Sequence, residues 1–244
     1  MTATHLELEP VHWSHIKQIG TSPKHYLAAV QSRPDTAAMR VGRATHAWTL
    51  QDIEPIVYTG KVRRGGAWED FQAKHPGAED ILSQGEAIAV TGMVNALRDH
   101  PTAMCLLRKE ATTVEVDAKW AYLDRACAGR LDAVGANYIC DLKTTNRIHP
   151  RLFLRHALNL GYHGQLAWYQ HGARQAGLSE ARDLYLVCVE SQAPWDVVCW
   201  ELDRTAIDAG RKLMRGYMEQ LQVCEATGHW PGIAEDILTF RLPD

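Results

Sequence analysis

The strongest structural signal in the chain lies in Gly129-Arg-Leu-Asp132-Ala-Val-Gly135-Ala-Asn137-Tyr-Ile-Cys-Asp141-Leu-Lys143-Thr-Thr145. It predicts two short strands that fold back at residues 135–137, because Gly and Asn tolerate the left-handed backbone of a tight hairpin. Side chains alternate along a strand, so Asp141 and Lys143 share one face of the second strand. The fold-back is expected to bring Asp132 opposite residues 140–141.

This hairpin predicts a site for a divalent cation. Asp132 and Asp141 crowd a small volume, and two nearby carboxylates repel each other unless a cation neutralises them. Two carboxylates with waters and a phosphate suit Mg²⁺, and Lys143 could orient or help deprotonate the water that attacks a phosphodiester. The same residues also suit a surface hairpin with an Asp–Lys pair, because short D-x-K strings are common.

A helix after the hairpin carries a second polar pair. Gln165 and Tyr169 are four residues apart, so both project from one helix face toward a phosphate oxygen, a base or Lys143. The helix is also amphipathic in the ordinary sense, with Leu166 and Trp168 as core residues.

These segments together resemble a known nuclease superfamily. Asp132 followed by Asp141-Leu-Lys143 is similar to the PD-(D/E)xK motif, and most of all to the branch of RecE (exodeoxyribonuclease VIII) and lambda exonuclease. Three further segments match that branch in the same order. They are His15 to Tyr26 with Ser22-Pro23, Val41-Gly42-Arg-Ala-Thr-His46-Ala, and Gly161-Tyr162-His163-Gly-Gln165-Leu-Ala-Trp-Tyr169.

The resemblance implies roles for particular residues. Asp132 and Asp141 would hold one or two Mg²⁺ ions, with Mn²⁺ as a substitute, and Glu115 and His46 would be further ligands. Lys143, Gln165, Tyr169 and His46 would complete the catalytic set with the two aspartates. From the residues alone, Glu115 could equally be a solvent-facing strand residue, and a lone helical histidine such as His46 is more often structural.

The resemblance also implies a reaction and partners. The expected activity is 5′→3′ digestion of linear double-stranded DNA from an end, in phage- or prophage-type recombination. A ring-shaped homo-oligomer, trimer or tetramer, would enclose the duplex, and a RecT-like single-strand annealing protein is a plausible partner. The alternatives are a restriction-type or structure-specific endonuclease of the same superfamily, a non-catalytic DNA-binding or phage assembly protein, and a phosphoesterase acting on small molecules.

The formal net charge of −3 does not indicate nucleic-acid binding, so a nuclease must carry its basic surface locally. The densest basic run lies between glycines and predicts a mobile loop that contacts phosphates, although such runs are often solvated turns. The predicted DNA contacts are Lys61, Arg63 and Arg64 in this run, Arg43 on a preceding helix, and Arg147, the first of three arginines spaced four apart.

Bulk composition predicts a single globular domain over residues 1–244, with 23% charged and 46% hydrophobic residues. No apolar run approaches a bilayer span, and the polar N-terminus lacks a secretory signal. The six cysteines are scattered without C-x-x-C pairs, as expected for buried thiols in a reducing cytoplasm. They also argue against an iron–sulfur cluster.

Local patterns predict an α/β fold with a mixed central β-sheet flanked by helices, which the resemblance makes a restriction-endonuclease-like PD-(D/E)xK core. Ser14 is expected to cap a short helix through Ile19, and Met39 and Ile88 to face the core. Further helices are predicted over residues 22–30, 36–51, 68–73, 83–99, 101–108, 162–176 and 205–227, and strands over 112–120, 183–190 and 197–203 beside the hairpin.

Overall fold

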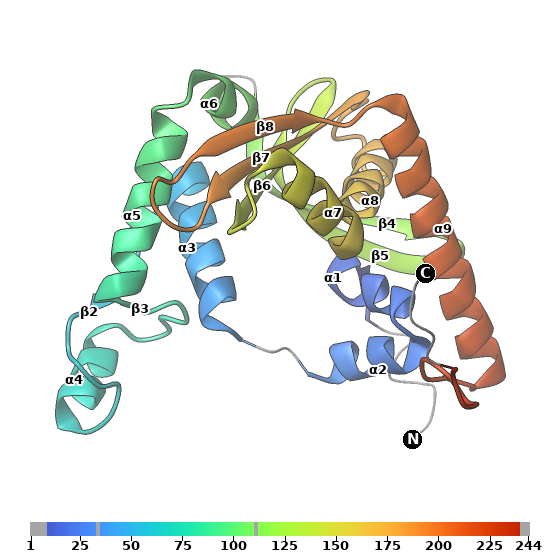
Figure 1. Ribbon diagram of the computed structural model, residues 1–244, viewed down its shortest axis with the longest axis horizontal. Coiled ribbons are helices and arrows are strands. Elements are labelled where there is room, and N and C mark those ends of the chain that lie inside the picture. The colour runs from blue at the N-terminus through green and yellow to red at the C-terminus, as the bar shows by residue number, and fades with distance from the viewer. Residues whose placement is uncertain (1–8, 33–34, 110–111, 240–244) are drawn as a thin grey trace.

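A mixed six-stranded sheet forms the centre of the computed structural model, which describes residues 9–32, 35–109 and 112–239 (Figure 1). The strand order is β1-β5-β6-β7-β8, and β4 pairs with β5 off this path. The β1–β5 and β6–β7 pairs are parallel and the others antiparallel, which confirms the predicted mixed sheet. The strands are β1 (Val11–His12), β4 (Thr113–Tyr122), β5 (Arg125–Val134), β6 (Tyr138–Thr145), β7 (Asp183–Glu190) and β8 (Val197–Glu201).

Helices cover both faces of this sheet, because its central strands are apolar on both sides. Along β6, Ile139 packs into one core and Cys140 and Leu142 into the other. One face carries α1 (Trp13–Ile16), the 3₁₀ turn η2 (Lys17–Gly20), α2 (Pro23–Gln31), α7 (Pro150–Leu160), α8 (Tyr162–Gln175) and α9 (Arg204–Thr227). The other carries α3 (Ala37–Gln51), α5 (Gln84–Arg98) and α6 (Pro101–Arg108).

A small outlying unit sits beyond one end of α5, away from the large sheet (Figure 1). It consists of the parallel pair β2 (Val57–Tyr58) and β3 (Leu82–Ser83) with α4 (Gly66–Lys74). The ring of Tyr58 contacts those of Trp68 and Phe71, each with centroids 4.9 Å apart. These three aromatic rings pack together as a small hydrophobic cluster. No residue of α4 is fully buried.

Most predicted helix ends are confirmed by their caps. The Ser22 side chain accepts from the His25 backbone N–H, and Ser83 and Glu86 form a reciprocal capping box. Gly228 ends α9 with a left-handed φ of 69°. Within the described ranges, none of the helices combines the length and apolarity needed to traverse a bilayer.

Three local predictions were wrong. Ser14 does not cap a helix, because α1 begins one residue earlier and tightens into a 3₁₀ turn at Lys17. Met39 and Ile88 are 46% and 60% exposed. Each lies five residues before a buried position on its helix, Ala44 and Met93, which turns it roughly 140° away from the buried stripe.

The hairpin register is confirmed, but the predicted turn conformation was wrong. Ala133 pairs with Cys140 and Val134 with Ile139, so Asp132 lies across from Asp141. Neither Gly135 nor Asn137 adopts a positive φ. Glycine is needed at 135 for space, since a Cβ there would lie 2.1 Å from the Tyr138 ring.

Candidate active site

The candidate site forms where one edge of β5 lies open. On the edge opposite β4, β1 pairs with residues 127–128 of β5, and β6 pairs with residues 133–134. Between those pairs the described part of the chain supplies no ladder partner. A cavity of about 410 Å³ occupies this opening. Its lining includes Gly129, Arg130, Lys143, Gln165 and Tyr169.

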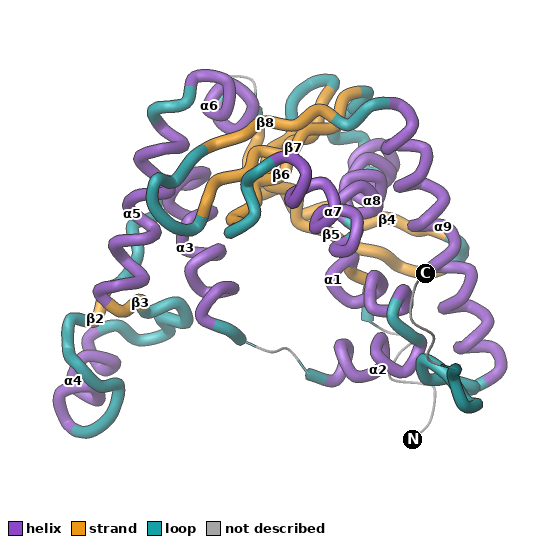
Figure 2. The backbone as a smooth tube through the Cα atoms, in the orientation of Figure 1, coloured by secondary structure: helices purple, strands orange, loops and turns teal. Residues whose placement is uncertain are grey.

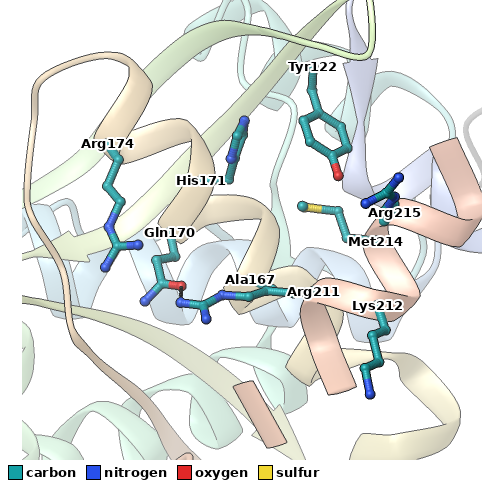
Figure 3. Close-up of a pocket in the computed structure, with 9 residues that line it drawn as sticks. All are labelled: Tyr122, Ala167, Gln170, His171, Arg174, Arg211, Lys212, Met214 and Arg215. Carbon is teal, nitrogen blue, oxygen red and sulfur yellow. Dashed lines mark hydrogen bonds between the residues drawn. The ribbon is translucent and has the colours of Figure 1, made fainter. Parts of the chain in front are cut away.

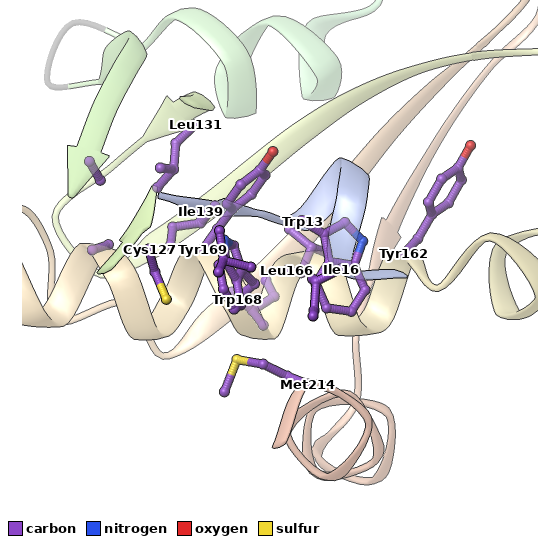
Figure 4. Packing of buried hydrophobic residues seen from close by; sticks show 14 of the residues in the cluster. Trp13, Ile16, Cys127, Leu131, Ile139, Tyr162, Leu166, Trp168, Tyr169 and Met214 are labelled. Carbon is purple, nitrogen blue, oxygen red and sulfur yellow. The ribbon is translucent and has the colours of Figure 1, made fainter. Parts of the chain in front are cut away.

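Helix α8 closes the cavity from one side and is fixed to β5. Leu166 and Trp168 are buried beneath the sheet (Figure 4), and the Trp168 indole N–H donates to the Ala128 carbonyl at 3.2 Å. Gly129 lets the helix approach, because a Cβ there would lie 2.8 Å from the Tyr169 ring. The polar side chains of α8 are therefore held at the opening in β5.

Three potential metal ligands meet at one end of the opening. His46 of α3, Glu115 of β4 and Asp132 of β5 each place a ligand atom within 4.8 Å of the other two. His46 Nδ1 lies 3.4 Å from Asp132 Oδ2. One imidazole and two carboxylates are ligands that Mn²⁺ and other divalent cations accept, and the oxygens suit Mg²⁺. The donor set therefore fits the divalent cation that the sequence predicts.

The backbone is distorted at this cluster. Glu115 has a φ of +52°, which is unusual for a residue with a side chain, above all within a strand. Val114 packs into one core and Val116 into the other, although alternate strand residues normally share a face. The pleat of β4 therefore reverses at Glu115, and such strain is typical of functional sites.

A second group of polar side chains surrounds Asp141. Lys143 Nζ lies 2.5 Å from Asp141 Oδ2, and the ammonium sits 4.9 Å from the centre of the Tyr162 ring. The Gln165 amide donates to Asp141 Oδ1 at 3.4 Å and to the Tyr169 hydroxyl at 2.9 Å. All of these contacts come from strand β6 and the first two turns of α8.

Asp132 links the two groups, because its Oδ2 accepts from the Leu142 backbone N–H at 2.7 Å. This bond replaces a ladder pair where β5 and β6 separate. The carboxylate is thereby held between the His46–Glu115 cluster and the Asp141–Lys143 pair.

The pKa values of the two aspartates are shifted in opposite directions. Burial raises the pKa of Asp141 to about 6, and the nearby Asp132 charge adds to the effect while Lys143 opposes it. Burial would also raise the pKa of Asp132, but the charges and hydrogen bonds of His46, Lys143 and Leu142 bring it below its usual value. Burial raises the pKa of Glu115.

Lys143 is held as a cation. Burial favours its neutral form, but Asp141 and Asp132 raise its pKa above the ordinary value. Of the two roles that an active-site lysine can take, its charge favours orienting a water or a phosphate over accepting a proton.

Two cations at the cavity were missed by sequence reasoning. Arg130 Nε lies 2.7 Å from Glu115 Oε2, and the Arg130 side chain is 57% exposed. Lys17 lines the same cavity, and burial first, then the Lys143 charge, lowers its pKa. Arg130 lies in the hairpin sequence two residues before Asp132, and the alternation of side chains along a strand could have indicated that the two share a face. Lys17 carried no sequence signal, because the pairing of β1 with β5 and the packing of η2 on α9 place it here, and both join distant parts of the chain.

None of the predicted DNA-contacting residues lines the cavity. Lys61 and Arg64 are exposed in the loop between β2 and α4 (Figure 2). Arg63 pairs with Glu86 at 3.1 Å, and Arg43 pairs with Asp35 and Asp80. Arg147 is exposed just after β6.

A mixed sheet covered by helices on both faces, with Asp132 on one central strand and Asp141 and Lys143 on the next, defines a nuclease domain of the PD-(D/E)xK superfamily. Residues 13–243 match the model of the family described as "PDDEXK-like domain of unknown function (DUF3799)". The chain belongs to this family.

A solved structure shares this fold. The crystal structure of a protein described as "Putative exonuclease" from Eubacterium rectale superimposes with a TM-score of 0.69. The alignment covers 99% of this chain and 93% of the other at 11% identity. No curated protein matches the chain.

Proposed function

We propose that the protein is a metal-dependent 5′→3′ exodeoxyribonuclease that degrades linear double-stranded DNA in phage- or prophage-type recombination. The observation that carries this proposal is that the His46–Glu115–Asp132 cluster is joined, through the hydrogen bond from Leu142 to Asp132, to the Asp141–Lys143 pair, whose lysine lines the cavity. Ligands for a cation and a partly buried ammonium beside an open cavity are the parts that phosphodiester hydrolysis needs.

His46, Glu115, Asp132 and Asp141 would hold the cation, with Mg²⁺ as the physiological choice and Mn²⁺ as a substitute. When bound, the cation neutralises the carboxylates and stabilises the charge that develops on the leaving oxygen. The buried position of Asp132 and Asp141, 8% and 1% exposed, strengthens their interaction with any cation that enters.

The remaining cavity residues would bind and align the substrate. Lys143 orients the attacking water and contacts the scissile phosphate through its ammonium. Gln165 fixes the Asp141 carboxylate, and the Tyr169 hydroxyl, to which Gln165 also donates, faces the same cavity. Arg130 and Lys17 supply further positive charge for the phosphates of the bound strand.

The polarity, the substrate and the assembly rest on the resemblance to the RecE and lambda-exonuclease branch. We extend the proposal to a ring-shaped trimer or tetramer in the cytoplasm, with a RecT-like annealing protein as partner. Duplex contacts outside the cavity are assigned to Lys61, Arg63, Arg64, Arg43 and Arg147.

The test is digestion of three DNAs with Mg²⁺: a linear duplex with a 5′-phosphate, the same duplex labelled at its 3′ end, and covalently closed circles. Lys143→Ala and Asp132→Ala are expected to lose at least about a thousandfold in rate. Lys119→Ala, an exposed lysine on β4, is the matched control and should retain full activity.

Release of mononucleotides from linear ends, with intact circles, is the expected result. Cleavage of closed circles would replace the exonuclease with an endonuclease of the same superfamily. A folded wild-type chain that hydrolyses none of the three DNAs with Mg²⁺ or Mn²⁺ would leave a DNA-binding protein in its place.

A further inference from the structure

A second cavity, of about 360 Å³, lies between α8, α9 and the end of β4 (Figure 3). Its buried apolar lining residues are Ala167 and Met214, which are 1% and 4% exposed. Four cationic side chains surround them, one from α8 and three from α9. The cations are Arg174, Arg211, Lys212 and Arg215.

This cavity is distinct from the candidate active site, although both use α8. Successive helix residues are separated by roughly 100°, so Ala167 points about 200° and Arg174 about 180° away from Gln165. Gln165 and Tyr169 line the opening in β5, whereas Ala167 and Arg174 line the second cavity. The two cavities therefore lie on opposite faces of one helix.

Two guanidinium groups are fixed by neutral oxygens. Arg174 donates to the Ala181 carbonyl at 2.7 Å, and Arg211 donates to the Gln170 side-chain oxygen at 2.8 Å. Gln170 is only 2% exposed and is itself held by the same Ala181 carbonyl at 3.0 Å. A neutral acceptor orients a guanidinium without cancelling its charge.

Carboxylates balance only half of the positive charge. Asp208 pairs with Arg211, and Glu219 pairs with Arg215. Four cations against these two anions leave an excess of two positive charges in a chain whose net charge is −3. Such a local excess favours an anionic ligand.

Aromatic rings stand beside the apolar lining. Tyr122 and His171 meet edge to face with centroids 4.7 Å apart, and both line the cavity. Burial first, and then the Arg174 charge, lowers the pKa of His171, so its ring is neutral near pH 7. A neutral ring pair beside alanine and methionine offers a surface on which a flat heteroaromatic group can pack.

We propose that this cavity binds a nucleotide, with the base against Ala167 and Met214 beside the Tyr122–His171 ring pair and the phosphate on the surrounding guanidinium groups. An apolar centre with a cationic margin matches a nucleotide better than a lone phosphate or a neutral ring. The ligand is either a free mononucleotide or one nucleotide of a DNA strand that passes over α8 and α9. The proposal concerns binding alone and does not depend on hydrolysis.

The test is calorimetry in EDTA, so that no cleavage occurs, with 5′-dAMP, deoxyadenosine, inorganic phosphate and a short oligo(dA) as separate probes. The wild-type chain is expected to bind dAMP at least about tenfold more tightly than deoxyadenosine or phosphate. A similar affinity for dAMP and oligo(dA) identifies a free nucleotide as the ligand, and a marked preference for oligo(dA) identifies a strand.

Two exposed cations can be reversed without touching a buried contact. Lys212→Glu combined with Arg215→Glu is expected to weaken dAMP and oligo(dA) binding at least about tenfold. The matched control, Lys74→Glu with Lys109→Glu, makes the same charge change elsewhere on the surface and should bind as the wild type does.

Lys143→Ala separates the two cavities, because it alters only the opening in β5. It should leave dAMP affinity unchanged, and a loss would place the nucleotide at the active site and overturn the proposal. Undiminished binding by the Lys212→Glu/Arg215→Glu variant, equal affinity for phosphate and dAMP, or no binding of any probe would also overturn it.

Discussion

His46 and Asp132 form a close pair, with Nδ1 and Oδ2 3.4 Å apart, within the candidate metal cluster. Burial disfavours a charged imidazole, but attraction and hydrogen bonding to Asp132 outweigh it and raise the pKa of His46 above its usual value. In the metal-free protein His46 therefore keeps its proton to a higher pH than a free imidazole does. A metal ligand must be neutral imidazole, so cation binding has to expel that proton.

We predict that Mn²⁺ binding near pH 6.5 releases up to about one proton, and that the release fades as the pH rises above the raised pKa of His46. Calorimetry in buffers of different ionisation enthalpy measures the number released. His46→Gln should reduce the release and weaken Mn²⁺ binding about tenfold or more. His229→Gln, on the exposed C-terminal segment, should change neither quantity. Full proton release by His46→Gln would contradict the assignment.

Helix α9 packs against α8, the helix that carries Gln165 and Tyr169 of the candidate active site. At Gly210, an added Cβ would lie 2.2 Å from the backbone oxygen of His163, which cannot swing away as a side chain can. The same helix contains Gly216, where a Cβ would meet nothing within 4 Å. One helix thus provides both a crowded and an open glycine.

We predict opposite signs for the two alanine substitutions. Gly210→Ala should destabilise the fold by about 1–3 kcal/mol, because α8 and α9 must move apart. It should also lower nuclease activity, since α8 carries Gln165 and Tyr169. Gly216→Ala should stabilise by up to about 1 kcal/mol through helix propensity. Urea unfolding measures both, and equal effects would refute close packing at Gly210.

At the scale of helices and strands, the sequence predicted correctly those elements that are marked by neighbouring residues in the chain. Ser22, the Ser83–Glu86 box and Gly228 mark helix ends through their own caps, and strand alternation located the β5–β6 hairpin. Glu115 shows the limit, since nothing in its sequence indicates a left-handed φ within a strand. Lys17 is a second example. It lies at the cavity because the two-residue strand β1 pairs with β5, more than a hundred residues later in the sequence, and the local sequence does not indicate this pairing.

The residues of the candidate site were also predicted where a local motif marks them. Asp132, Asp141, Lys143, Gln165, Tyr169 and His46 were selected from the sequence. The structure places Lys143, Gln165 and Tyr169 at the cavity, with Asp141 and then Asp132 and His46 behind them, although their chemical roles remain predictions. The exposed cations of the β2–α4 loop were selected only for composition. They lie in an outlying unit, and their contact with DNA stays a prediction too (Figure 1).

At the scale of the whole molecule, α7 presents exposed apolar side chains. Leu154 and Leu158 are 50% and 63% exposed, and lie one helical turn apart on one face. With Phe153 and Trp200 they line an apolar cavity of about 350 Å³. Exposed apolar surface of this kind marks contact sites between proteins.

We predict that the wild-type chain sediments at three or four times its own mass, and that Leu154→Ser combined with Leu158→Ser yields single chains. Because enclosure of the duplex would confer processivity, the double variant should release DNA after few nucleotides while its Mn²⁺ affinity stays unchanged. Leu178→Ser with Val223→Ser removes comparable exposed apolar surface elsewhere and should preserve the assembly. A wild-type chain that is monomeric yet processive would exclude the ring, and an intact assembly in the double variant would move the interface away from α7.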